Sequence, residues 1–217
     1  MNGSDSEATV RHESPRSLTY SRWNPPVSSH LADLEGVWND LFSARDFILR
    51  LEAQLHASSH DYTLLDALAI AALTRYARSF TTGVRQRLDA SKSEVLDSSE
   101  LALHKRLLAV RDKHVAHPVN CFETHAIYVG FCPDDPSSAH ATVVSTGTRT
   151  SIGVNLEEIV GLKVICEKWL NHVHELKEVE ETNLLAYAQQ LTASQLLALP
   201  RGPVEPHDDP TRVRSRT

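Results

Sequence analysis

The segment from Arg111 to His117, which reads Arg-Asp-Lys-His-Val-Ala-His, gathers side chains that are suited to phosphate chemistry. An arginine guanidinium stabilises the negative charge of a phosphate, because its fork of N–H donors fits the oxygen atoms of that group. A histidine can accept or release a proton near neutral pH. Arg111 and His117 therefore supply the minimum equipment of a ribonuclease that works without a metal ion. Lys113 and His114 between them are candidates for binding RNA phosphates.

Arg111 is predicted to emerge from the apolar face of a helix, whereas Asp112 points away from that face and can accept a hydrogen bond. The residues that share the side of Arg111 are Leu101, His104, Leu107, Leu108 and Val115. A charged group in this position needs a partner, since burying an unpaired charge costs on the order of several kcal/mol. The partner could be a group across a subunit interface, a phosphate or an acid of the bundle. The candidate acids are Glu35, Asp46 and Asp66.

A purely structural interpretation of the segment also exists. Pro118 removes a backbone donor and disfavours helix at the residue before it, so the helix is predicted to end at His117. Basic side chains in the last turns, Lys113, His114 and His117, would then complement the helix dipole. In that case Arg111 would only neutralise a buried acid.

The spacing Arg-x5-His is not rare in this composition, since it also occurs at Arg50–His56 and Arg201–His207. Arg50 is followed by the apolar Leu51, and the Arg201 match lies in a proline-rich tail. Only the segment 111–117 combines the spacing with a polar residue after the arginine and a position where a helix must end. The context of the motif therefore carries more information than its spacing.

In this context the chain resembles the HEPN superfamily, and the run from Leu107 to His117 looks especially like its abortive-infection branch. The resemblance implies a four- or five-helix bundle, a homodimer that brings two motifs into one cleft, and RNA cleavage without metal or another cofactor. It also implies His117 as general base or acid, Arg111 as the stabiliser of the scissile phosphate, and Asp112 as the residue that orients them.

Other groups are candidates for weaker roles. Arg75 and Arg78, beside Tyr76, could extend a phosphate-binding surface, or could simply reach water from a helix whose aromatic residues are core. A zinc site is a further alternative, although its spacing matches no familiar closed site. Its ligands would be His114, His117, Cys121 and His125. No glycine-rich phosphate loop and no Gly-x-Ser-x-Gly elbow is present in the sequence.

Charge and composition limit the function classes. The net charge of −6 argues against a surface that is basic all over, but the segment 75–117 alone carries a net +4, which leaves −10 for the rest. The three cysteines include no Cys-x-x-Cys pair and fit reduced thiols. Neither a secretory signal nor an apolar run of membrane-spanning length is present, so a cytoplasmic protein without a membrane segment is expected.

Hydrophobic periodicity predicts a mainly α fold, a four- or five-helix bundle with a small β-hairpin insertion between helices three and four. We expect disordered segments at 1–27 and 199–217 and a helical domain at 28–198, with the β insertion at about 124–153. The predicted strands are 125–131 and 141–145, with a further short strand at 149–154. The first, fourth and fifth helices are predicted at 29–57, 155–178 and 181–198. The second is predicted to begin behind Asp61, its N-cap, and to run to about 82, and the third to start after Ser98 or Ser99 and to end at His117.

The function predicted from these features is a metal-independent HEPN-type endoribonuclease of the toxin or phage-defence kind. Its expected partners are RNA, a second copy of the chain and an antitoxin. The alternative is a non-catalytic helical module that binds a partner or forms dimers, which the net acidity favours, since a protein that grips long RNA gains from positive charge.

Overall fold

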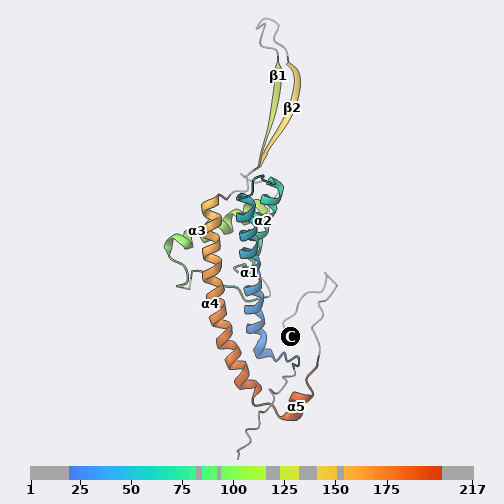
Figure 1. The fold of residues 1–217 in the computed structure, drawn as a ribbon, viewed down its shortest axis with the longest axis vertical. Helices are drawn as coiled ribbons and strands as arrows, with labels where there is room; N and C mark the ends of the chain where they lie inside the picture. The colour runs from blue at the N-terminus through green and yellow to red at the C-terminus, as the bar shows by residue number, and fades with distance from the viewer. Residues whose placement is uncertain are drawn as a thin grey trace, which may run out of the picture.

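The computed structural model describes residues 20–81, 85–91, 94–115, 123–131, 141–150 and 154–201. Within these ranges the chain forms a mainly helical bundle with a two-stranded antiparallel hairpin between its third and fourth helices, which confirms the predicted fold class. Figure 1 shows the hairpin projecting from one end of the bundle.

The first two helices, α1 (Ser29–Leu55) and α2 (Tyr62–Arg78), pack against each other. α2 begins behind the predicted cap, Asp61, whose carboxylate accepts a hydrogen bond from the backbone N–H of Leu64. Three of the buried residues of α2 are alanines, Ala69, Ala72 and Ala77. α2 ends at Arg78, earlier than the predicted end at 82, which lies outside the described residues.

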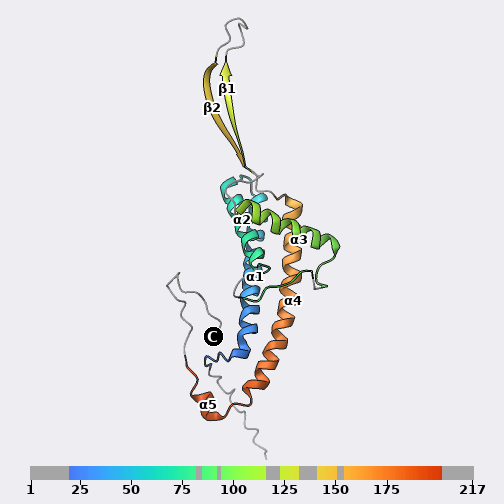
Figure 2. The ribbon, with the colours of Figure 1, turned by 180° about the vertical axis from the view of Figure 1, so that it is seen from behind.

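The third helix, α3 (Ser98–Val110), starts with a capping box in which Asp97 and Glu100 satisfy each other's backbone N–H groups. Figures 1 and 2 show that α3 runs across the bundle rather than along it. It continues into a single π-helical turn, η2 (Arg111–Val115). The predicted helix end at His117 lies outside the described residues.

The fourth helix, α4 (Leu156–Ala188), closes the bundle by packing along α1. It starts with a second capping box, formed by Asn155 and Glu158. The predicted end at 178 and the new helix at 181 were wrong, because α4 continues unbroken through both positions. In the described residues after it, a short helix α5 (Ala193–Leu197) follows. The physical reason is that no glycine or proline interrupts the sequence between 162 and 199.

The hairpin consists of β1 (Glu123–Phe131) and β2 (Ala141–Thr150), paired so that Ile127 lies opposite Thr146 and Val129 opposite Val144. The large apolar side chains described in it are exposed, Ile127 to 74%. The strands contact each other far more than they contact the helices. β2 is longer than predicted, and the separate strand expected at 149–154 begins inside it.

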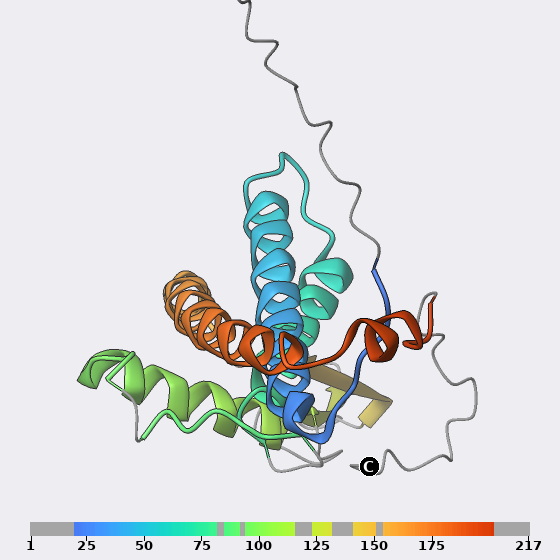
Figure 3. The ribbon, with the colours of Figure 1, turned by 90° about the horizontal axis from the view of Figure 1, so that it is seen from below.

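The core lies between α1, α2 and α4, with α3 covering one side. Figure 3, a view from below, shows α1 in the middle with α2 on one side and α4 on the other. The largest fully buried side chains are Trp169, Tyr76, Leu41, Ile48, Leu51, Leu73, Leu107 and Ile165. Three polar residues, Asp40, Ser79 and His104, are buried with them. Two of these buried polar residues, Asp40 and His104, link helices to each other.

The two predicted terminal segments fall mainly outside the described residues. Of the N-terminal segment, the described residues before α1 contact the end of the bundle, where the Trp23 ring stacks on Tyr187 with 5.7 Å between ring centroids. The backbone N–H of Arg22 donates to the carbonyl oxygen of Pro200. None of the described helices combines the length and the apolar composition that a bilayer-spanning helix needs.

Candidate functional site

The helix that carries Arg111 is fixed to the bundle by its apolar face and by one buried hydrogen bond. His104 Nδ1 and the Tyr76 hydroxyl lie 2.7 Å apart and share a hydrogen bond between α3 and α2. Leu107 and Val110 are almost fully buried one and two turns later. The π-helical turn η2 in turn contacts α2. The backbone that presents Arg111 is therefore held in place by the core.

Arg111 is the first residue of η2, and its side chain is 26% exposed. Its Nη1 donates to Asp112 Oδ1 at 2.9 Å, and the Asp112 side chain is 62% exposed. The Nε atom of Arg111 is buried and has no hydrogen-bond partner within the described part of the chain. The guanidinium is thus half-buried, oriented by one exposed carboxylate, and has donor capacity that a ligand could use.

The π-helical turn is a feature that the sequence did not indicate. A π turn closes i→i+5 hydrogen bonds, so it holds one residue more than an α-helical turn, and such turns occur frequently at functional sites. The constant helical rotation used to place Arg111 on the apolar face therefore does not extend beyond this residue. Arg111 itself still falls where the sequence placed it, beside the core, and Asp112 still points outward.

The remaining residues of the motif are only partly described. Lys113 is exposed, as a phosphate-binding role requires. His114 belongs to η2, but the described part of the structure does not include its side chain, and His117 lies outside the described residues. The predicted roles of His114 and His117 therefore stay predictions.

Two of the three acids that were candidate partners of Arg111 have other contacts. Glu35 accepts a hydrogen bond from Lys177 Nζ at 2.5 Å, and Asp46 pairs with Arg50 one turn along α1. The ion-pair partner that the described structure gives Arg111 is its sequence neighbour, Asp112. The interpretation of Arg111 as the neutraliser of a buried acid loses support from this geometry.

Arg75 and Arg78, the other predicted phosphate-binding residues, meet a buried acid that the sequence analysis overlooked. Asp40 of α1 has a side chain only 3% exposed, and it receives Arg75, Arg78 and also Arg85. A signal existed, since Asp40 lies three residues after the buried Val37 and so on the apolar side of its helix. We call these four residues the Asp40 cluster.

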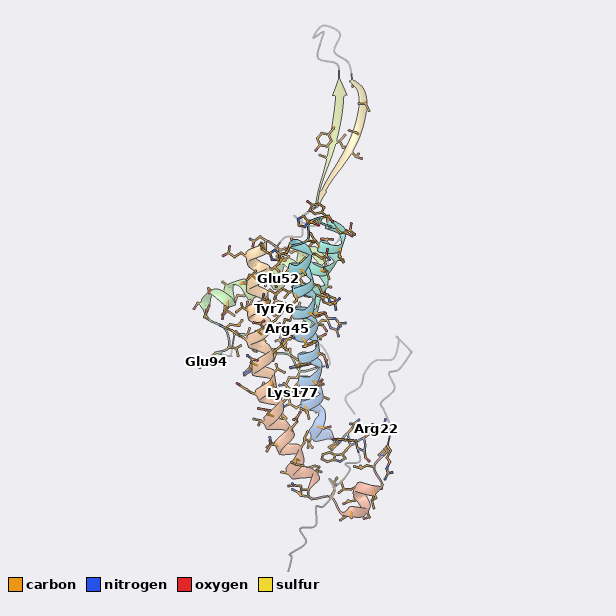
Figure 4. The ribbon with its side chains drawn as sticks, viewed as in Figure 1. Arg22, Arg45, Glu52, Tyr76, Glu94 and Lys177 are labelled. Carbon is orange, nitrogen blue, oxygen red and sulfur yellow. The ribbon has the colours of Figure 1, made fainter. Side chains whose placement is uncertain are left out.

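The Tyr76–His104 pair was also missed. The two rings pack against Phe80, which in turn lies edge-on to Trp169, so the pair sits in an aromatic cluster. Figure 4 labels Tyr76 in the middle of the bundle. Burial raises the pKa of the Tyr76 hydroxyl, while burial and the nearby Lys105 lower the pKa of His104. Both groups are therefore kept neutral, which suits a structural bond between helices.

The zinc alternative cannot be placed in this structure. Its candidate ligands, His114, His117, Cys121 and His125, either lie outside the described residues or have side chains that are not described. Within the residues described here, no group of three or more potential metal-ligating side chains forms.

Comparisons with known proteins found no match for this chain. No family model, no curated protein and no solved structure matches the chain.

Proposed function

We propose that this chain is a HEPN-like, metal-independent endoribonuclease of the toxin or phage-defence kind, which acts as a homodimer. The observation that supports the proposal is the half-buried Arg111 guanidinium, which opens a π-helical turn, is oriented by Asp112 and keeps a buried Nε without a partner in the described residues. Six residues after it, the sequence places His117.

The proposed reaction uses His117 of both copies for proton transfer, and Arg111 and Asp112 for the phosphate. His117 removes the proton of an RNA 2′-hydroxyl, and the 2′-oxygen attacks the adjacent phosphorus. The bond from phosphorus to the 5′-oxygen breaks, and that oxygen takes a proton from a second His117 supplied by the other copy of the chain. Arg111 stabilises the added negative charge on the phosphate, and Asp112 orients Arg111. The products carry a 2′,3′-cyclic phosphate and a 5′-hydroxyl.

The predicted partners fit this scheme. Two copies are needed to bring two motifs together, and a toxin of this kind requires an antitoxin that blocks the motif until it is released. Exposed Lys113 and the side chain of His114 would bind neighbouring phosphates of the RNA. Figure 2 shows that α3 ends at the same end of the bundle as the hairpin.

The test incubates the purified full-length protein with total RNA, with and without EDTA. We expect cleavage that survives the chelator and is lost, by about a hundredfold or more, in Arg111→Ala and His117→Ala. The ends of the products should be 2′,3′-cyclic phosphates. Size-exclusion chromatography with light scattering measures whether the active form is a dimer.

The chain offers a matched control for the motif. Arg50 and His56 have the same spacing on α1, but Arg50 pairs with Asp46 on the helix surface. Arg50→Ala and His56→Ala should cleave RNA like the unaltered protein. The proposal fails if no cleavage is seen, if the motif variants still cleave, or if the control variants lose activity to the same extent.

A second function, a non-catalytic helical binding module, is favoured by the net charge of −6. A module of this kind would keep the dimer and bind a partner through the basic end of α3. It would show no RNA cleavage under any condition of the same experiment, yet Arg111→Ala would still weaken partner binding. The two candidate functions are therefore separated by a single cleavage gel.

A further inference from the structure

Three guanidinium groups from two parts of the chain converge on one buried carboxylate in the Asp40 cluster. Arg75 Nη1 lies 3.0 Å from Asp40 Oδ1, Arg78 Nε lies 3.4 Å from Oδ2, and Arg85 Nη2 lies 2.5 Å from Oδ2. Arg75 and Arg78 come from the last turn of α2, and Arg85 comes from the connection that follows it. Both oxygen atoms of Asp40 are therefore occupied by arginine.

The charges of the cluster do not balance. Three cations face one anion, so the group retains a net charge of +2. A guanidinium has five N–H donors, and the hydrogen bonds of these arginines in the described structure go only to Asp40 and to the carbonyl oxygen of Arg78. The side chains of Arg75, Arg78 and Arg85 are 43%, 51% and 25% exposed. The surface of the cluster therefore carries both unused N–H donors and an excess of positive charge.

Besides its bond to Asp40, Arg85 is held in place by its own surroundings. Arg85 lies over Gly36, one turn before Asp40 on α1, and a Cβ atom at this glycine would come within 2.5 Å of Arg85 Nη1. The backbone on either side of Arg85 is also tied down, because Gln86 N–H donates to Asp33 Oδ2 at 2.8 Å and Leu88 N–H donates to the Ser79 carbonyl at 2.9 Å. A ligand that meets these guanidinium groups loses little affinity to their ordering.

From this geometry we propose that the Asp40 cluster is a binding site for a terminal phosphate monoester, separate from the Arg111 motif. A terminal phosphate carries a charge of about −1.5 to −2 near pH 7, which matches the excess of +2, whereas a phosphate within a strand carries only one negative charge. The planar fork of arginine suits the oxygen atoms of such a group. The phosphate belongs to a free nucleotide or to the end of a nucleic-acid strand.

This inference does not depend on RNA cleavage. The site is built on α1 and α2 and on the connection that leads to α3, whereas Arg111 pairs with its own neighbour in η2. Asp40 acts as the positioning residue, because it gathers the arginines without itself contacting the phosphate. A protein that fails to cleave RNA would still bind the phosphate here, so the two proposals can fail separately.

The experiment measures binding to the full-length protein by isothermal titration calorimetry. The probes are adenosine monophosphate, a single-stranded deoxyoligonucleotide with a 5′-phosphate and the same oligonucleotide with a 5′-hydroxyl. Deoxyoligonucleotides lack the 2′-hydroxyl, so cleavage at the motif cannot change the probe. We expect the 5′-phosphate oligonucleotide or the mononucleotide to bind at least about tenfold more tightly than the hydroxyl probe, the gain expected of one charge-assisted contact.

Two variants of the cluster and one control sharpen the result. Arg78→Ala removes the most exposed guanidinium, and Gly36→Ala displaces Arg85 while leaving every charge present; each should weaken phosphate binding by about tenfold. Arg50→Ala removes an arginine from a surface ion pair on α1, outside the cluster, and should leave phosphate binding unchanged. Circular dichroism and thermal melting confirm that each variant is folded.

The outcomes separate the sources of the phosphate. Equal binding of the mononucleotide and the phosphorylated strand would identify a nucleotide ligand, and stronger binding of the strand would identify a strand end. The proposal is overturned if phosphate and hydroxyl probes bind alike, if no probe binds, or if Arg50→Ala weakens binding as much as Arg78→Ala. If a variant unfolds, the comparison of the phosphate and hydroxyl probes on the unaltered protein decides the outcome.

Discussion

Two carboxylates of this chain pair with arginine in opposite ways. Asp40 is buried in the wall of the bundle and binds three arginines that come from two other parts of the chain. Asp112 is exposed and binds the arginine directly before it. The first carboxylate determines where its arginines lie, whereas the second only orients one guanidinium that the helix has already positioned. A buried acid thus builds a surface of fixed shape, and an exposed acid leaves its arginine free to exchange partners.

The largest expected effect on stability follows from removing the buried acid. Asp40→Ala leaves three like charges without their anion and opens space between α1 and α2, so we expect the free energy of unfolding to fall by about 2–4 kcal/mol. Urea denaturation followed by circular dichroism measures the change. An effect below about 1 kcal/mol would show that the arginines relax into water and that Asp40 does not organise them.

A smaller loss of stability is expected from breaking the neutral hydrogen bond between Tyr76 and His104. Tyr76→Phe removes the hydroxyl that meets His104 and leaves Nδ1 buried without its partner, which should cost about 1–3 kcal/mol. Tyr62→Phe is the control, because that ring is exposed at the start of α2. Equal melting temperatures for the two variants would contradict a structural role of the buried bond and would leave charge as the main organiser of this region.

The same pair predicts a dependence on pH. The pKa of His104 is lowered in the folded protein, chiefly by burial, so below about pH 6.5 the unfolded state binds more protons than the folded state. Stability is therefore fully present above the unfolded pKa and falls as the pH drops below it, as from pH 7 to pH 5.5. Denaturation curves of the unaltered protein and of His104→Phe at both pH values measure this contribution. A loss that is equally large in His104→Phe would assign it to other groups.

The smallest effect on stability is expected for the exposed acid, Asp112. Asp112→Ala removes an exposed ion pair and should change the free energy of unfolding by no more than about 0.5 kcal/mol. Its effect should instead appear in function, as a loss of RNA cleavage that Asp112→Asn partly restores, because the amide oxygen can still accept from Arg111. A destabilisation comparable to that of Asp40→Ala would remove the distinction between the two acids.

The sequence was sufficient to predict the helical bundle and the position of the hairpin, because both depend on local periodicity and on local caps. Asp61, for example, caps α2 as its position before an apolar run indicated. The predicted boundary at 178–181 was wrong, because three of these four residues are glutamates, which favour helix, and α4 continues through them. The π-helical turn at Arg111 could not be foreseen, because its extra residue has no local signature in composition.

The candidate site was predictable only where its contacts are local. The partly buried position of Arg111 and the exposed position of Asp112 agree with the side of the helix on which each falls, but their ion pair was not predicted. The contact between Asp40 and Arg85 joins residues 45 positions apart, and it depends on the way α2 returns along α1. Arg75 and Arg78 were identified as basic residues, but the acid that gathers them became visible only with the packing of the helices.

The position of the hairpin in the sequence affects the loop that closes when α4 packs on α1. α4 is joined to α1 across a long separation, as the contact between Lys163 and Glu52, 111 residues apart, shows. Loop-closure entropy grows only with the logarithm of length, so the residues from 123 to 150 add roughly 0.3 kcal/mol to the closing of this loop. The insertion therefore occupies a place where the bundle tolerates added chain at almost no thermodynamic cost. Because its strands pair with each other and hardly touch the helices, hairpins of different length and sequence could be exchanged at this position while α1 and α4 still find each other.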